Sequence, residues 1–392
     1  MTTTSEAPAT GSAPTPLAST GKDHRGSWIP TWGMVTTRLM ELRRRRGLMI
    51  ALAAVNIGIP VIFLGIRLIT HAVAPKSYGP AGGYDIFTSL VPGFLYIFGF
   101  IVAAVVGATA GSIDLTEGTF RHLVITGRSR VALYLARIPA GLAIVISMVA
   151  IGYTIVCAVC VFAAPTQLNY DGVVVPQGLS RPALDNWAAA HADEVICNFN
   201  YNGREQPPNV PCGNGPQGSF VIKGPPGTPT PPPATKAEAR AFAVTMANQS
   251  YTDYLSQFTV PSITLMFDVG LWIALEAIMG FIVGLGLSSL MGQRTVPIII
   301  LIVLELILTP IFSRHVITYM INLERGLIGV AMAHIEPGRL PSPFGGAFGG
   351  GGGGPNGNML IPESTLAASL VIVGWIVFWT AIGAWRMARR DA

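Results

Sequence analysis

The chain has 392 residues, of which 51% are hydrophobic and only 11% charged, with a formal net charge of +5 and a mean hydropathy of +0.52. This composition excludes an ordinary soluble domain and predicts a polytopic membrane protein. The excess of positive charge does not indicate nucleic-acid binding, because the arginines gather beside apolar runs.

The chain begins with two segments that precede the first apolar run. Residues 1–27 are rich in Thr, Ser, Ala and Pro and predict a disordered cytoplasmic tail, because they contain no apolar core. In residues 28–46, apolar side chains recur mostly every three to four positions and arginines gather at the end (Trp28, Trp32, Val35, Leu39, Leu42 and arginines 43–46). This pattern predicts an amphipathic interfacial helix, with its arginines against anionic membrane lipid.

Six apolar runs approach or exceed the roughly 20 residues that cross a bilayer. They are residues 48–69, 86–110, 131–163, 260–290, 296–311 and 366–385. The expected fold is therefore an all-α polytopic membrane protein with six transmembrane helices. Arginines concentrate before span one, between spans two and three, between four and five and after six, so the positive-inside rule predicts that both termini are cytoplasmic.

These spans divide the chain into segments. The expected order is a tail (1–27), an interfacial helix (28–46), spans one to three (47–163, with a cytoplasmic segment at 112–130), an extracytoplasmic insert (164–257), spans four and five (258–312), a second outer segment (313–363), and span six with its tail (364–392).

The two outer segments differ in composition. The insert at 164–257 is long enough for a small ectodomain, with helical patterns at 182–196 and 234–255 on either side of a Pro- and Gly-rich middle. Its two cysteines, Cys197 and Cys212, lie on the oxidising side and predict a disulfide. Residues 313–363 begin with an apolar stretch that predicts an interfacial or re-entrant helix and continue into a Gly-rich linker.

Enzyme signatures are absent from the sequence. It contains no GxxxxGK[ST], HExxH or GxSxG, so we expect no catalytic residues, no metal site and no nucleotide bound by this chain. Cys157 and Cys160 form a CxxC inside span three, where we expect packing thiols and not a redox motif.

Three acidic residues lie inside predicted spans. Asp268 and Glu276 belong to span four and Glu305 to span five. An ionised acid at the bilayer centre costs at least about 2.5 kcal/mol, so such residues are candidates for a cationic-substrate or proton path. The alternative is that they are protonated and hydrogen-bonded between helices as packing contacts.

The polar segment 112–130 lies between two of the most apolar runs, and its sequence resembles a known family. An acidic residue, Gly-Thr, an apolar stretch, a Thr-Gly-Arg turn and a long third span resemble the permease subunits of ABC-2 type ATP-binding cassette transporters. In that family this loop forms a coupling helix on a separate ATPase subunit. The resemblance implies that the corresponding contact here involves Glu117, Gly118, Thr119, Phe120, Arg121 and Leu123.

The resemblance implies an exporter permease in the cell membrane. It implies partnership with an ABC ATPase subunit that binds ATP and Mg²⁺, and with a second permease copy in a homo- or heterodimer. The low Lys content and abundant Ala, Gly and Pro are typical of a GC-rich bacterium.

Two alternatives remain open, namely a proton-coupled secondary transporter that uses the intramembrane acids and a membrane scaffold that displays an ectodomain. The sequence does not indicate the substrate.

Overall fold

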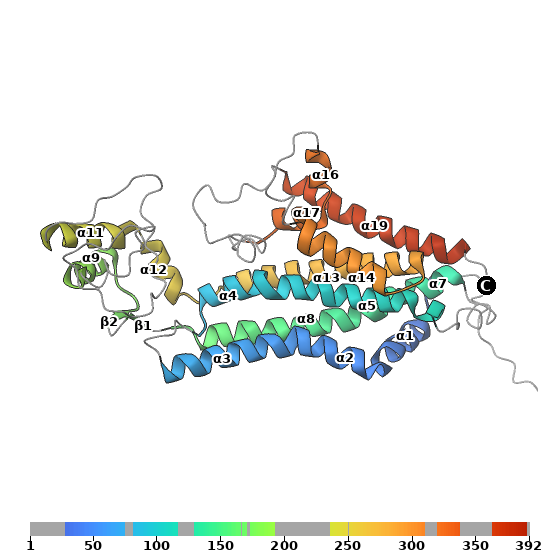
Figure 1. Ribbon diagram of the computed structural model, residues 1–392, viewed down its shortest axis with the longest axis horizontal. Helices are drawn as coiled ribbons and strands as arrows, with labels where there is room; N and C mark the ends of the chain where they lie inside the picture. The colour runs from blue at the N-terminus through green and yellow to red at the C-terminus, as the bar shows by residue number, and fades with distance from the viewer. Residues whose placement is uncertain are drawn as a thin grey trace, which may run out of the picture.

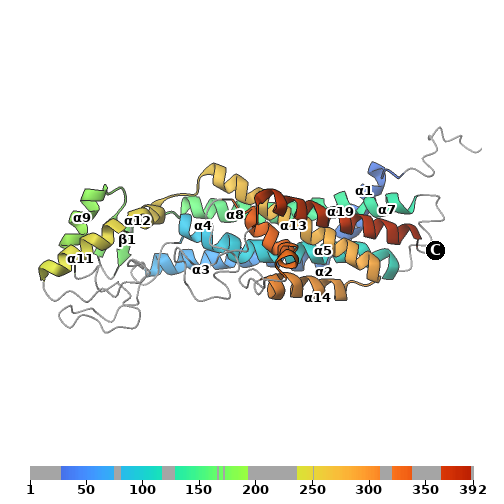
Figure 2. The ribbon, with the colours of Figure 1, turned by 90° about the horizontal axis from the view of Figure 1, so that it is seen from above.

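The computed structural model describes residues 28–74, 81–116, 129–165, 167–170, 173–192, 236–249, 251–309, 320–337 and 363–389. Long helices run side by side in an elongated bundle, and a smaller unit of short helices with one β-hairpin lies beyond one end of it (Figures 1 and 2). The N-terminal helix and the C-terminal end of the last helix lie together at the opposite end.

Five described helical segments are long and apolar enough to cross a membrane. They are Arg46–Val73, Phe94–Asp114, Arg130–Phe162, Ile263–Met291 and Thr365–Arg389. They coincide with predicted spans one to four and six, which confirms a multi-pass helical membrane protein. The apolar helix at the fifth predicted span, Thr295–Leu308, is shorter, and residues 310–319 lie outside the described chain. The sixth crossing therefore stays a prediction.

Several spans are built from more than one helical segment. Span one comprises α2 (Arg46–Ala53), η1 (Ala54–Gly58) and α3 (Ile59–Val73), and span two comprises α4 (Tyr84–Leu90), η2 (Val91–Tyr96) and α5 (Ile97–Thr116). Span three comprises α7 (Arg130–Leu135) and α8 (Arg137–Phe162), whereas span four is the single helix α13 (Ile263–Met291). The segments α14 (Thr295–Ile302) and η3 (Val303–Leu308) follow it, and α19 (Thr365–Arg389) is the last helix. The elements η1, η2 and η3 are π-helical turns, which often mark functional positions within helices.

Helices α5 and α13 form the centre of the bundle. In the most apolar stretch of the second span 78% of residues are buried, and in the fourth 72%, against 17% in the last. Glycines permit this close packing: a Cβ at Gly284 would lie 2.6 Å from the carbonyl oxygen of Ala104, and one at Gly107 would overlap that of Phe281. Small residues at helix crossings let backbones approach and gain dispersion contacts, which stabilise helix association in lipid.

The smaller unit contains strands as well as helices. Strands β1 (Gln167–Tyr170) and β2 (Val173–Pro176) pair antiparallel, and helices α9 (Arg181–Ala190), α11 (Lys236–Gln249) and α12 (Tyr251–Phe258) accompany them. The hydroxyl of Tyr254 donates to Pro176 O at 2.6 Å and accepts from Leu179 N at 3.0 Å, so it ties α12 to the hairpin. The helices confirm the two helical patterns predicted in the insert. This hairpin departs from the expected all-α fold. Its second strand, β2, is rich in β-branched valine and follows Asp171-Gly172, a sequence typical of hairpin turns.

The described part of the predicted second outer segment, residues 320–337, contains two short helices instead of one. Helix α16 (Ile321–Arg325) ends at Gly326, and α17 (Ile328–His334) is buried against α19. Two indole groups hold this segment: Trp272 Nε1 donates to Met332 O at 3.0 Å, and Trp375 Nε1 donates to Gly326 O at 2.8 Å.

Substitution of Gly107 tests the central contact. We expect Gly107→Ala to lower the free energy of unfolding by about 1–3 kcal/mol, because the added methyl group forces α5 and α13 apart. Gly374→Ala is the matched control, since no atom lies within 4 Å of a Cβ there. The control should keep or raise stability, because alanine favours helices. Unfolding in mixed detergent micelles measures both variants, and equal stabilities would contradict the packing argument.

Candidate functional site

Helix α1 (Trp32–Arg44) confirms the predicted N-terminal helix but divides its apolar residues between two environments. Val35 and Leu42 are buried, and Val35 packs on Ala136 and Ala140 at the start of span three. Trp28 and Trp32 are 74% and 78% exposed. The bundle therefore covers Val35 and Leu42 and leaves the two tryptophans outside, and the interfacial position of this segment stays a prediction.

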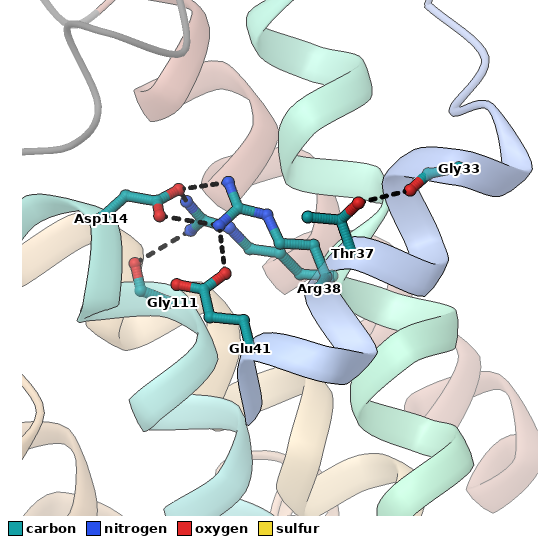
Figure 3. Close-up of polar contacts among 7 residues, drawn as sticks. Gly33, Thr37, Arg38, Glu41, Gly111 and Asp114 are labelled. Carbon is teal, nitrogen blue, oxygen red and sulfur yellow. Dashed lines mark hydrogen bonds and ion pairs between the residues drawn. The ribbon is translucent and has the colours of Figure 1, made fainter. Parts of the chain in front are cut away.

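The buried face of α1 also carries a charge. Arg38 is only 7% exposed, and its guanidinium group forms two hydrogen bonds with the carboxylate of Asp114 on α5, at 2.8 and 2.6 Å (Figure 3). The same guanidinium donates to Glu41 at 2.7 Å. Because a two-pronged contact fixes both distance and orientation, it holds α1 against the end of span two.

A second arginine binds the same carboxylate. Arg137, the first residue of α8, is 1% exposed and forms an ion pair with Asp114 Oδ2. It also donates to Gly111 O at 3.1 Å. Asp114 thus joins three segments that are distant in sequence, which are α1, α5 and α8. We call Arg38, Asp114 and Arg137 the ion-pair network.

The electrostatic surroundings of Arg38 favour its charged form. Burial disfavours the charge on Arg38, but the hydrogen bonds and negative charges of Asp114 and Glu41 outweigh that effect and hold the pKa of Arg38 above its ordinary value. The Asp114 side chain is 1% exposed, so the two arginines take the place of water around its carboxylate.

The network lies beside the segment that the sequence singled out. Helix α5 ends at Thr116, two residues after Asp114, and α7 begins at Arg130, seven residues before Arg137. The predicted contact residues Glu117, Gly118, Thr119, Phe120, Arg121 and Leu123 lie in 117–128, outside the described chain. Their role stays a prediction.

The three intramembrane acids separate into two environments. Asp268 is exposed, whereas Glu276 is 0% and Glu305 is 2% exposed. Tyr96 of η2 lies close enough to Glu276 and Glu305 to interact with both. The structure therefore brings two of the acids together and leaves Asp268 apart from them.

Within the described chain, neither the cysteines nor the residue types that can bind a metal ion form a further site. Cys157 and Cys160 are free thiols, and Cys160 is fully buried. Cys197 and Cys212 lie outside the described residues, so their disulfide stays a prediction. Across the described ranges, no group of three or more His, Cys, Asp or Glu side chains could hold a metal ion.

Comparison with protein-family models, with curated proteins and with solved structures gives no match for this chain.

The sequence patterns did not single out Arg38, Asp114 or Arg137 as a site. The available signal was an acid at the end of an apolar run, with arginines at the start of the neighbouring runs. A charge at such a position is costly unless it is paired, so the pairing could be suspected. The partner could not be chosen from sequence, because several arginines lie at the same end.

Asp114→Asn tests the network. We expect it to lower the free energy of unfolding by about 3–5 kcal/mol, because it leaves two buried arginines without their carboxylate. Glu41→Gln removes a more exposed partner of the same Arg38, and its side chain is 29% exposed, so we expect a change within about 1 kcal/mol. Chemical unfolding in mixed micelles distinguishes the variants. Similar losses in both would show that Asp114 is not the centre of the network.

Proposed function

We propose that this protein is the permease subunit of an ABC-2 type exporter, driven by ATP hydrolysis in a separate subunit. The observation that carries the proposal is the position of the ion-pair network at the two ends of segment 117–128. Asp114 precedes this segment and Arg137 follows it, so the two spans that the segment connects meet at one buried carboxylate.

A network of this kind suits mechanical coupling. A partner that pushes on residues 117–128 acts on α5 and α7, and through Asp114 and Arg38 on α1. Breaking a buried ion pair by removing one partner costs about 3–5 kcal/mol, so the three helices respond as a unit. Because α5 packs along α13 at the centre of the bundle, its displacement is transmitted to the spans around it.

The nucleotide chemistry comes from another chain in this proposal. The sequence has no P-loop, so ATP and Mg²⁺ bind to the ATPase subunit. Closure of two ATPase subunits would press on one segment 117–128 in each of two permease copies. The five membrane-crossing helices are compatible with a permease and carry no statement about the substrate.

Charge reversal in segment 117–128 tests the ATPase contact. We expect Glu117→Arg combined with Arg121→Glu to weaken co-purification of a P-loop ATPase subunit co-expressed from the same organism by about tenfold or more, which corresponds to about 1.4 kcal/mol. Arg240→Glu, on the exposed side of α11 in the smaller unit, is the matched control and should leave co-purification unchanged.

Two outcomes would overturn the proposal. One is normal co-purification by a correctly inserted double variant. The other is a wild-type chain that retains no P-loop ATPase at all, combined with transport in vesicles that contain a proton gradient but no ATP. The second result would favour the proton-coupled transporter.

A further inference from the structure

The buried acids Glu276 of α13 and Glu305 of η3 lie close enough to interact with each other. Both oxygens of Glu276 and Oε1 of Glu305 have no partner at hydrogen-bonding geometry among the described residues. The other oxygen of Glu305 lies 3.4 Å from the Thr309 hydroxyl, which shares its single proton with Leu304 O at 3.0 Å. Three carboxyl oxygens are thus buried without a hydrogen bond of standard geometry, and Tyr96 is the described hydroxyl that interacts with both acids.

No described basic side chain forms an ion pair with either acid. Two other titratable groups belong to this region, namely Tyr96 of η2, which interacts with both acids, and Glu336, which follows α17 and interacts with Tyr96. Neither can supply a positive charge. Two neighbouring carboxylates in an apolar interior repel each other and lose their hydration, so both cannot stay ionised. This setting contrasts with Asp114, which two arginines neutralise.

The packing around the pair limits what can neutralise it. Tyr96 stacks on Trp272 with ring centroids 4.4 Å apart, and this covers one side. Helix α17 covers another, where a Cβ on Gly329 would lie 2.6 Å from Glu305 Oε1 and would overlap Thr309. On that side there is no room for a methyl group, so an organic cation cannot approach there. A proton needs no such space.

We propose that Glu276 and Glu305 form a proton-binding site, occupied at neutral pH and enclosed by Tyr96 and α17. This site is separate from the ATPase contact and does not depend on it. Glu336, which follows α17 and is partly buried, interacts electrostatically with the same Tyr96. Burial raises the pKa of Glu336 to about 8, so that group can take up and release protons near neutral pH.

Proton occupancy is linked to the position of α17. Loss of the proton would leave negative charge against Gly329 and Thr309, which offer no compensating positive charge. Deprotonation therefore favours a state in which α17 moves away and water reaches Glu305.

Infrared spectroscopy of the purified full-length chain in lipid nanodiscs tests the proposal. Exposed carboxyl groups, with pKa values of about 4, are ionised at neutral pH. We therefore expect the spectrum of the wild type minus that of the double variant Glu276→Gln, Glu305→Gln to contain the C=O stretch of a protonated carboxyl group. Asp268→Asn, on the exposed side of the same α13, is the matched control: adding Glu276→Gln and Glu305→Gln to this variant should remove the same C=O band.

The absence of a protonated band from the double-variant difference would overturn the proposal, because the pair would then be ionised. A second measurement uses the wild type alone and does not depend on folding of the variants. A hydrophobic carbodiimide, which reacts with protonated carboxyl groups, should modify Glu276 or Glu305 at neutral pH, as read by peptide mass spectrometry. The absence of modification at both residues would contradict a protonated site.

Discussion

A charge inside this bundle must be paired or neutralised, because the apolar interior cannot replace the hydration that the charge loses. The structure meets this constraint in two ways. Asp114 lies between two arginines from different helices and stays in an ion-pair network. Glu276 and Glu305 meet no described cation and, as we infer, hold a proton instead. The presence or absence of a nearby guanidinium group therefore separates a fixed structural contact from an exchangeable one.

Both polar centres depend on the close contact between α5 and α13. Asp114 lies near the end of α5, Tyr96 directly precedes its start, and Glu276 belongs to α13. Tyr96 and Asp114 are separated by 18 residues, or about 27 Å along a helix. The backbone approach at Gly107 and Gly284 leaves little freedom for these helices to slide independently. In the proposed transporter, a displacement of α5 that begins beside segment 117–128 would thus be felt at the enclosed acid pair.

Much of the architecture could be predicted from local patterns. Runs of apolar residues located the membrane-crossing helices, and apolar residues that recur every three to four positions located α1, because a helix has a repeat of 3.6 residues. The same spacing could not decide how α1 is oriented. Val35 and Leu42 face the bundle whereas Trp28 and Trp32 do not, and this depends on α8 lying beside the helix. The hairpin was missed although Asp171 and Gly172 carry a turn signal, since the four-residue strands are too short to show a clear alternation.

The candidate sites show the same division. The sequence by itself determined that the protein crosses a membrane several times, that acids occur within its spans, and that it lacks a P-loop, because these properties depend only on the order of residue types. Tertiary structure decided that Glu276 joins Glu305 while Asp268 stays exposed, and that Asp114 binds Arg38, 76 residues away, and Arg137. These outcomes depend on which helix faces lie together. Sequence spacing describes one helix at a time, whereas the partners of a buried charge come from its neighbours in space.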